Sequence, residues 1–109
     1  MTLTVSIHPQ VTKFIDKNLS PEDKVRVLDL LDRLATYGTQ LGWPYTRQIE
    51  GKLWELRPQT TLGTWRFLYF VAPERRFLIV VAMRKRAWID TKIKQTAQGR
   101  LTYFDSEEG

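Results

Sequence analysis

The sequence predicts an α+β domain: an antiparallel β-sheet, made of a three-strand meander and an N-terminal strand, packed against two N-terminal helices and a C-terminal helix. Three observations predict this class. Two amphipathic helical patterns come first, three strand-like runs joined by short turns follow, and helix formers return at the end. The 109 residues are long enough for one core and too short for two. We expect one domain over residues 1–104 and an acidic tail at 105–109.

The N-terminal part predicts a short strand and two helices. Residues 2–7 alternate between apolar and polar and are rich in β-branched side chains, which favours a strand. Pro9 suits the first turn of a short amphipathic helix. A second helix is expected over about residues 21–37, because Ser20 can cap it and Gly38 can end it. Its expected apolar face consists of Val27, Leu28, Leu31, Leu34 and Ala35.

The middle of the chain changes to the period of β-structure. Glycine and proline punctuate residues 42–51, which we predict to be a loop. The runs KLWELR (52–57), TWRFLYF (64–70) and FLIVVAM (77–83) then predict an antiparallel meander with the third strand in its interior. Helix formers from Trp88 to Phe104 predict a terminal helix over the sheet. The residues expected in the core rather than on a base-stacking surface are Trp54, Trp65, Phe67 and Phe77.

The composition excludes several kinds of chemistry. Without cysteine the chain has no disulfide and no thiolate ligand or nucleophile, and with one histidine it has little material for a zinc site or a histidine-based triad. We therefore expect no cofactor and no metal. His8 is expected to cap a helix or lie on the surface. No apolar stretch is long enough to span a membrane, and the N-terminus lacks the pattern of a signal peptide, so we expect a cytoplasmic protein.

The positive charge is concentrated in the second half of the chain. Residues 1–42 carry five cations and five anions, whereas residues 43–104 carry twelve cations and four anions, a surplus of eight. In an antiparallel meander the ends of the first and third strands lie at the same edge as the start of the second. Arg57, Arg66 and the cations at 84–86 should therefore converge there. Such a convergence suits a polyanion, although a solvated face remains the alternative.

Two interpretations of these arginines stay open. In the first, Arg66 pairs with Glu55 on a neighbouring strand and Arg57 is solvated. In the second, they form a cradle for phosphate, because the planar guanidinium group can hold two oxygens at once. Trp88, which follows the cations, either caps the sheet under the terminal helix or stacks on a base. Tyr103 is a candidate for proton transfer.

Taken together, the motifs GKLWELR (51–57), GTWRFLYF (63–70) and FLIVVAMRKR (77–86) resemble those of the RelE/ParE superfamily of type II toxin–antitoxin toxins, in particular its HigB-like, phage-derived branch. The resemblance extends from about Val5 to Tyr103. It implies a RelE-like fold and a toxin that cuts messenger RNA in the ribosomal decoding site without metal, with the ribose 2′-hydroxyl as nucleophile. This toxin would inhibit translation and would be neutralised by an antitoxin, expected to be a helix-turn-helix DNA-binding protein.

The resemblance also implies roles for individual residues. The cations that it places on the scissile phosphate, as catalytic residues, are Arg57, Arg66, Lys85 and Arg86. The residues that we expect to bind RNA around them are Lys52, Arg84, Trp88 and Tyr103. Some superfamily members act on DNA gyrase without cleaving RNA, so a non-enzymatic gyrase inhibitor and an inactive cationic binding module remain the alternatives.

Overall fold

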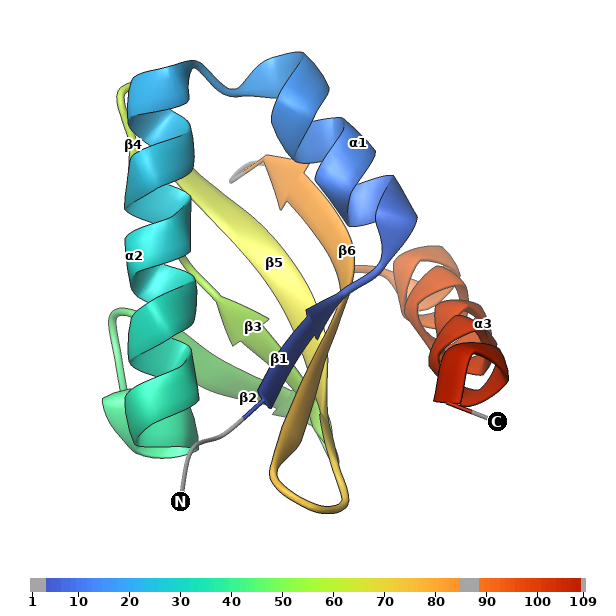
Figure 1. The fold of residues 1–109 in the computed structure, drawn as a ribbon. Coiled ribbons are helices and arrows are strands. Elements are labelled where there is room, and N and C mark those ends of the chain that lie inside the picture. The colour runs from blue at the N-terminus through green and yellow to red at the C-terminus, as the bar shows by residue number, and fades with distance from the viewer. Residues whose placement is uncertain (1–3, 85–88, 109) are drawn as a thin grey trace.

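The computed structural model describes residues 4–84 and 89–108, and it has the α+β architecture expected from the sequence (Figure 1). The predicted phosphate-binding cations Lys85 and Arg86 lie outside the described residues, and so does Trp88, which was expected either to cap the sheet or to stack on a base. In chain order the elements are β1 (Thr4–Ile7), α1 (Pro9–Asn18), α2 (Pro21–Tyr37), the 3-10 helix η1 (Gly38–Leu41), β2 (Thr46–Glu50), β3 (Leu53–Leu56), β4 (Gln59–Thr60), β5 (Gly63–Ala72), β6 (Arg76–Arg84) and α3 (Thr91–Glu108).

The sheet is mixed, with the strand order β1-β6-β5-β3-β2, and β4 pairs with β5 beside this path. Strands β3, β5 and β6 form the predicted antiparallel meander, in which Leu56 lies opposite Phe67 and Phe67 opposite Ala82. Strand β1 adds to β6 in parallel. The meander brings the end of β3, the start of β5 and the end of β6 to one edge of the sheet, as the sequence predicted.

Helices α1 and α2 begin where the local sequence predicts, and α2 also ends there. His8 caps α1, because its Nδ1 accepts the backbone N–H of Gln10 at 3.0 Å. Ser20 caps α2 by accepting the N–H of Asp23 at 3.2 Å, and the helix ends at Gly38, whose φ is 60°. Helix α3 begins at Thr91 rather than at the expected Trp88, since the Asp90 carboxylate accepts the N–H of Ile93 at 2.9 Å.

The core lies in two layers, one on each face of the sheet. Helices α1 and α2 cover one face, where their apolar residues pack on Leu56, Trp65, Phe67 and Tyr69. Helix α3 packs on the other face against side chains such as Leu68 and Val80 (Figure 1). Trp65, Phe67 and Phe77 are buried and Trp54 is partly buried against them, so the four aromatic residues expected in the core are confirmed.

Besides the parallel pairing of β1, in a sheet predicted to be antiparallel, and the later start of α3, three features differ from the sequence prediction. Residues 46–50 form the edge strand β2 rather than a loop, and the short strand β4 lies within the predicted turn before β5. On α2, Leu28 is exposed and Leu30 takes its place in the core. The reason is angular: Leu30 follows Val27 by three residues and lies on the buried face, whereas Leu28 is rotated from Val27 by about 100°.

The C-terminal residues and the helix lengths add two observations. Residues 105–108 of the expected acidic tail continue helix α3. Within residues 4–84 and 89–108, no helix is long and apolar enough to cross a membrane.

Candidate functional site

A fully buried carboxylate, that of Glu55, lies on β3 near the edge where the meander strands converge. Its backbone is fixed from β2, because the Thr46 hydroxyl donates to the Glu55 carbonyl at 2.7 Å. Thr46 in turn lies 2.6 Å from the hydroxyl of Tyr69. Burial raises the pKa of Tyr69 and this hydrogen bond lowers it. Because burial has the larger effect, the pKa rises to about 12. The chain therefore holds Glu55 in place through neutral, buried contacts.

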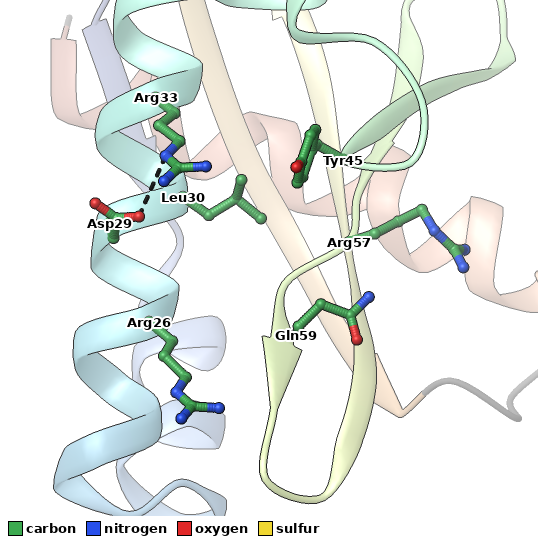
Figure 2. A pocket seen from close by; sticks show the side chains of 7 residues that line it. All are labelled: Arg26, Asp29, Leu30, Arg33, Tyr45, Arg57 and Gln59. Carbon is green, nitrogen blue, oxygen red and sulfur yellow. Dashed lines mark ion pairs between the residues drawn. The ribbon is translucent and has the colours of Figure 1, made fainter.

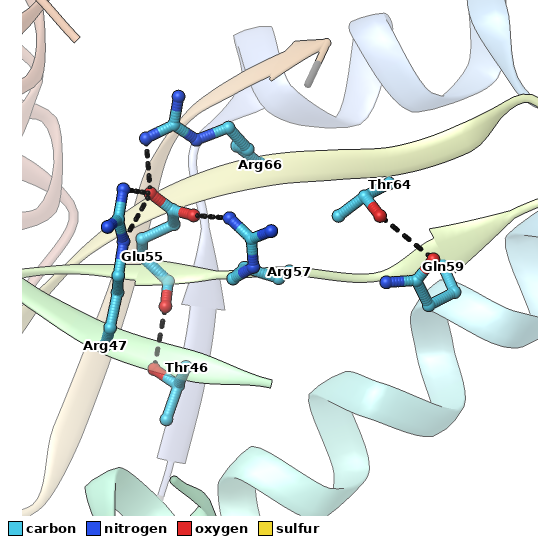
Figure 3. A network of polar contacts seen from close by, with 7 residues as sticks. All are labelled: Thr46, Arg47, Glu55, Arg57, Gln59, Thr64 and Arg66. Atoms are coloured by element: carbon cyan, nitrogen blue, oxygen red, sulfur yellow. Dashed lines mark hydrogen bonds and ion pairs between the residues drawn. The ribbon is translucent and has the colours of Figure 1, made fainter. Parts of the chain in front are cut away.

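Three arginines surround this carboxylate: Arg47 on β2, Arg57 directly after β3, and Arg66 on β5 (Figure 3). Arg57 donates from Nη1 to Glu55 Oε1 at 2.6 Å, and Arg66 donates from Nη2 to Oε2 at 2.6 Å. Arg47, directly opposite Glu55 on β2, donates to Oε2 from Nε and Nη2 at 3.4 and 3.3 Å. We call these four residues the Glu55 cluster: Arg47, Glu55, Arg57 and Arg66.

The strand register explains why a carboxylate is needed here. Leu56 is paired with Phe67, so in the same register Arg57 and Arg66 lie opposite one another, and like charges at opposed positions destabilise a sheet. Glu55, two residues before Arg57, has one oxygen for each of them. Burial alone raises the pKa of Glu55, but the hydrogen bonds from Arg66 and Arg57 outweigh it and hold this pKa below its ordinary value. Glu55 is therefore ionised at neutral pH.

The Glu55 cluster keeps a net positive charge, with three guanidinium groups against one carboxylate. Arg57 and Arg66 are mostly buried, with 15% and 11% of their side chains exposed, and Arg47 is 45% exposed. Among the described residues, Nε of Arg57 is buried and has no hydrogen-bond partner. A buried donor without a partner costs stability, and such groups in native proteins often have a functional role. The arrangement is chemically suited to an anion with several oxygens, such as phosphate.

A tryptophan lies against the outer side of the cluster. The guanidinium carbon of Arg57 is 4.6 Å from the ring centroid of Trp43, and that of Arg47 is 5.9 Å from it. These distances are those of cation–π contacts. Trp43 belongs to the segment between η1 and β2 and is 64% exposed. Sequence patterns did not single out Arg47 or Trp43, because glycine and proline give their segment the pattern of a loop.

The structure combines the two interpretations of the predicted arginines. Arg66 pairs with Glu55, as the first interpretation proposed, but Arg57 pairs with the same carboxylate rather than being solvated. The structure thus brings Arg57 and Arg66 together. It leaves their catalytic role as a prediction.

The other predicted residues lie elsewhere. Arg84 is at the same edge of the sheet but on the opposite face, where its guanidinium carbon lies 5.8 Å from the ring centroid of the buried Trp65. Lys52 is in the turn before β3, at the other end of that strand from Arg57. Tyr103 is on α3 with its ring 5.0 Å from that of His8. The structure therefore does not group Arg84, Lys52 and Tyr103 with the Glu55 cluster.

A shallow pocket of about 220 Å³ lies between α2 and the segment from β3 to β4 (Figure 2). Its lining residues are Arg26, Asp29, Leu30, Arg33, Tyr45, Arg57 and Gln59. Arg33 pairs with Asp29 at 3.2 Å, and Arg26 pairs with Glu22 at 3.3 Å, so neighbours on the same helix partly neutralise both. Figure 2 shows the guanidinium group of Arg57 pointing away from the pocket. The pocket is thus distinct from the side of the Glu55 cluster on which its guanidinium groups lie.

Comparison with known proteins identifies relatives by family and by fold. The family described as phage-derived protein Gp49-like (DUF891) matches residues 14–102. No curated protein matches the sequence. Among solved structures, the chain is similar to a free-state structure of the Escherichia coli toxin RelE with two arginines replaced by alanine. The two share 12% identity and a TM-score of 0.65, over 92% of this chain and 98% of the other. At that identity the likeness shows the fold.

Proposed function

The chain belongs to the Gp49-like family of phage-derived proteins, a family of RelE-like toxins, and from this premise we propose that it cleaves messenger RNA on the ribosome. Family and fold both indicate a toxin of the toxin–antitoxin type. The ribosome-dependent endoribonuclease activity is the step that we add. The observation that carries it is the Glu55 cluster, in which three arginines from β2, β5 and the end of β3 are held together with a net positive charge.

The proposed reaction is an internal transfer of the phosphate. The ribose 2′-oxygen attacks the adjacent phosphorus, the bond to the 5′-oxygen of the next nucleotide breaks, and the products are a 2′,3′-cyclic phosphate and a 5′-hydroxyl. Negative charge builds up on the non-bridging oxygens as the pentavalent state forms. Preorganised guanidinium groups stabilise that charge because they need no reorganisation as it develops. Arg57 and Arg66 are the groups that we assign to this role.

Glu55 has a positioning role in this proposal and is not the base. Its carboxylate is fully buried, both of its oxygens accept arginine donors, and its pKa is held below the ordinary value by those donors despite burial. A carboxylate in that state is a poor proton acceptor. The proton leaving the 2′-hydroxyl and the one joining the 5′-oxygen are therefore handled by groups outside the Glu55 cluster. Lys85 and Arg86 keep their proposed place on the phosphate.

The proposed cleavage of messenger RNA on the ribosome implies a substrate and an inhibitor. Messenger RNA in the ribosome is the substrate, and an antitoxin, expected to be a helix-turn-helix DNA-binding protein, is the inhibitor. A polycationic site is suppressed most directly by acidic side chains or by steric cover. We expect binding of the antitoxin to weaken as salt is raised if the cover is acidic.

The experiment that tests the function is primer extension on a defined messenger RNA incubated with the purified protein, with and without ribosomes. We expect cuts only with ribosomes, and upstream fragments that end in a cyclic phosphate. Cuts that need added metal, or that leave a 5′-phosphate, would contradict the proposed chemistry. Growth arrest without any cut would favour the gyrase-type inhibitor, and neither arrest nor cuts would favour an inactive binding module.

A further inference from the structure

Trp43 is a large aromatic side chain in an unusual position. Its side chain is 64% exposed, although tryptophan gains more than most residues from burial. It lies beside the Glu55 cluster, and two of the three arginines of that cluster contact its ring. The exposed fraction shows that these contacts leave much of the indole surface open to solvent.

The segment that carries Trp43 is fixed by the backbone. The carbonyl of Gly42 accepts the N–H groups of Tyr45 and Thr46 at 2.9 and 3.0 Å. The carbonyl of Tyr45 accepts the N–H of Arg57 at 2.8 Å, which joins the segment to the end of β3. Gly42 has a φ of 72°, a conformation that favours glycine. The indole is therefore presented from a tight turn tied to the same strand end as Arg57.

We propose that Trp43 is the stacking surface for an unpaired nucleobase of the RNA whose phosphate the Glu55 cluster binds. This inference rests on the proposed function and deepens it. A nucleotide combines an anionic phosphate with a flat aromatic base, and guanidinium groups next to an exposed indole present the matching pair of surfaces. The 4.6 Å contact between Arg57 and the ring places the two surfaces side by side.

The chemistry of the surroundings favours RNA over a protein partner. The side chains in contact with the indole are cationic, and a nucleotide brings an anionic phosphate and a flat base together in one unit, whereas a protein must supply the two from separate side chains. Stacking accepts every base, because each one has an aromatic face. Trp43 should therefore position the nucleotide without selecting its identity. From the sequence, Trp88 was a candidate for this role, with capping of the sheet as the alternative, and it lies outside the described residues.

The test combines two protein variants with abasic substrates. We would compare wild type with Trp43→Ala and Trp43→Phe, using Tyr37→Ala as the control, because Tyr37 is a similarly exposed aromatic residue at 59% and lies outside the Glu55 cluster. The substrates are ribosome-bound messenger RNAs with one abasic nucleotide at successive positions around the cut. We expect Trp43→Ala to lower kcat/KM by about 10-fold to 100-fold on the intact RNA, as the loss of one stacked base does. Trp43→Phe should retain most activity, and Tyr37→Ala should match wild type.

The decisive readout is the coupling between the side chain and the base. At one position, the abasic substitution should lower kcat/KM of wild type by the same factor by which Trp43→Ala lowers it on the intact RNA. At that position it should lower kcat/KM of the Trp43→Ala variant little further. If the variant is impaired by the same factor at every abasic position, Trp43 only supports Arg57 and the inference is wrong. It is also wrong if Trp43→Ala cleaves normally, whether or not it loses antitoxin binding. A wild-type protein that never cleaves RNA would overturn the proposed function instead.

Discussion

Replacing Glu55 by glutamine tests whether one buried anion holds the arginine cluster together. The substitution keeps the shape of the side chain and removes the charge, so three guanidinium groups lose their shared partner. Removing one partner of a buried ion pair destabilises a protein by about 3–5 kcal/mol, because the remaining charge stays buried without compensation. Arg47 is 45% exposed and water can solvate it, so we expect ~3 kcal/mol, the lower end of that range.

The assay is equilibrium unfolding in urea, supported by thermal unfolding. A loss of ~3 kcal/mol lowers Tm by roughly 12 °C in a domain of this size, at about 4 °C per kcal/mol. Glu50→Gln is the matched control, because Glu50 pairs with Lys94 at 3.1 Å and its side chain is 69% exposed. An exposed pair of this kind contributes about 0.5 kcal/mol or less.

Activity provides a second readout of the same change. Below the Tm of Glu55→Gln, the folded variant should cleave messenger RNA more slowly than Glu50→Gln does, since Arg57 and Arg66 are no longer held at fixed positions. A Glu55→Gln protein within about 0.5 kcal/mol of wild type, the usual scatter of surface substitutions, would refute the view that this carboxylate organises the cluster.

Two further predictions concern the ionisation and the neutral contacts of the site. Burial raises the pKa of Glu55, but the arginine hydrogen bonds lower it by more, so its folded-state pKa lies below the ordinary value of 4.5. The stability advantage of wild type over Glu55→Gln should therefore be complete above about pH 4.5 and should decline as the pH falls through the lower folded-state pKa. Urea unfolding of both proteins at a series of pH values measures this advantage. An advantage independent of pH would contradict the ion-pair explanation. Tyr69→Phe should lower the free energy of unfolding by about 1 kcal/mol, the net value of one hydrogen bond, because Thr46 keeps its bond to the Glu55 carbonyl. Unchanged stability in that variant would show that the Tyr69 hydroxyl contributes nothing to holding β2 against β3.

Local sequence signals predicted the fold well where they were strong. The helix over residues 21–37 was expected from its cap and its glycine stop, and the structure has it at Pro21–Tyr37. The meander followed from three runs with β-period, and its antiparallel order placed Arg57 and Arg66 at one edge. Strand β2 was missed because an edge strand paired on one side needs no apolar alternation, and TRQIE has little.

The candidate site was predictable only in part, since its geometry depends on register and on which face a residue takes. Arg84 reaches the predicted edge but lies on the face of Trp65, because residues directly opposite in a register point to the same side. Trp43 and Arg47 enter the site through β2, and their signal was hidden in a segment read as a loop. Recognising strand β2 in the sequence would have placed Arg47 opposite Glu55.

The most direct test of the central claim is the single-turnover rate at which Arg66→Ala cuts ribosome-bound messenger RNA. Arg33→Ala is the control, because Arg33 lies on α2 and pairs with Asp29 outside the Glu55 cluster. Removing one preorganised donor to a developing negative charge slows a reaction about 100-fold to 1000-fold, so we predict that loss for Arg66→Ala and a wild-type rate for Arg33→Ala. A folded Arg66→Ala protein that cuts within threefold of wild type would contradict the claim that the Glu55 cluster binds the scissile phosphate.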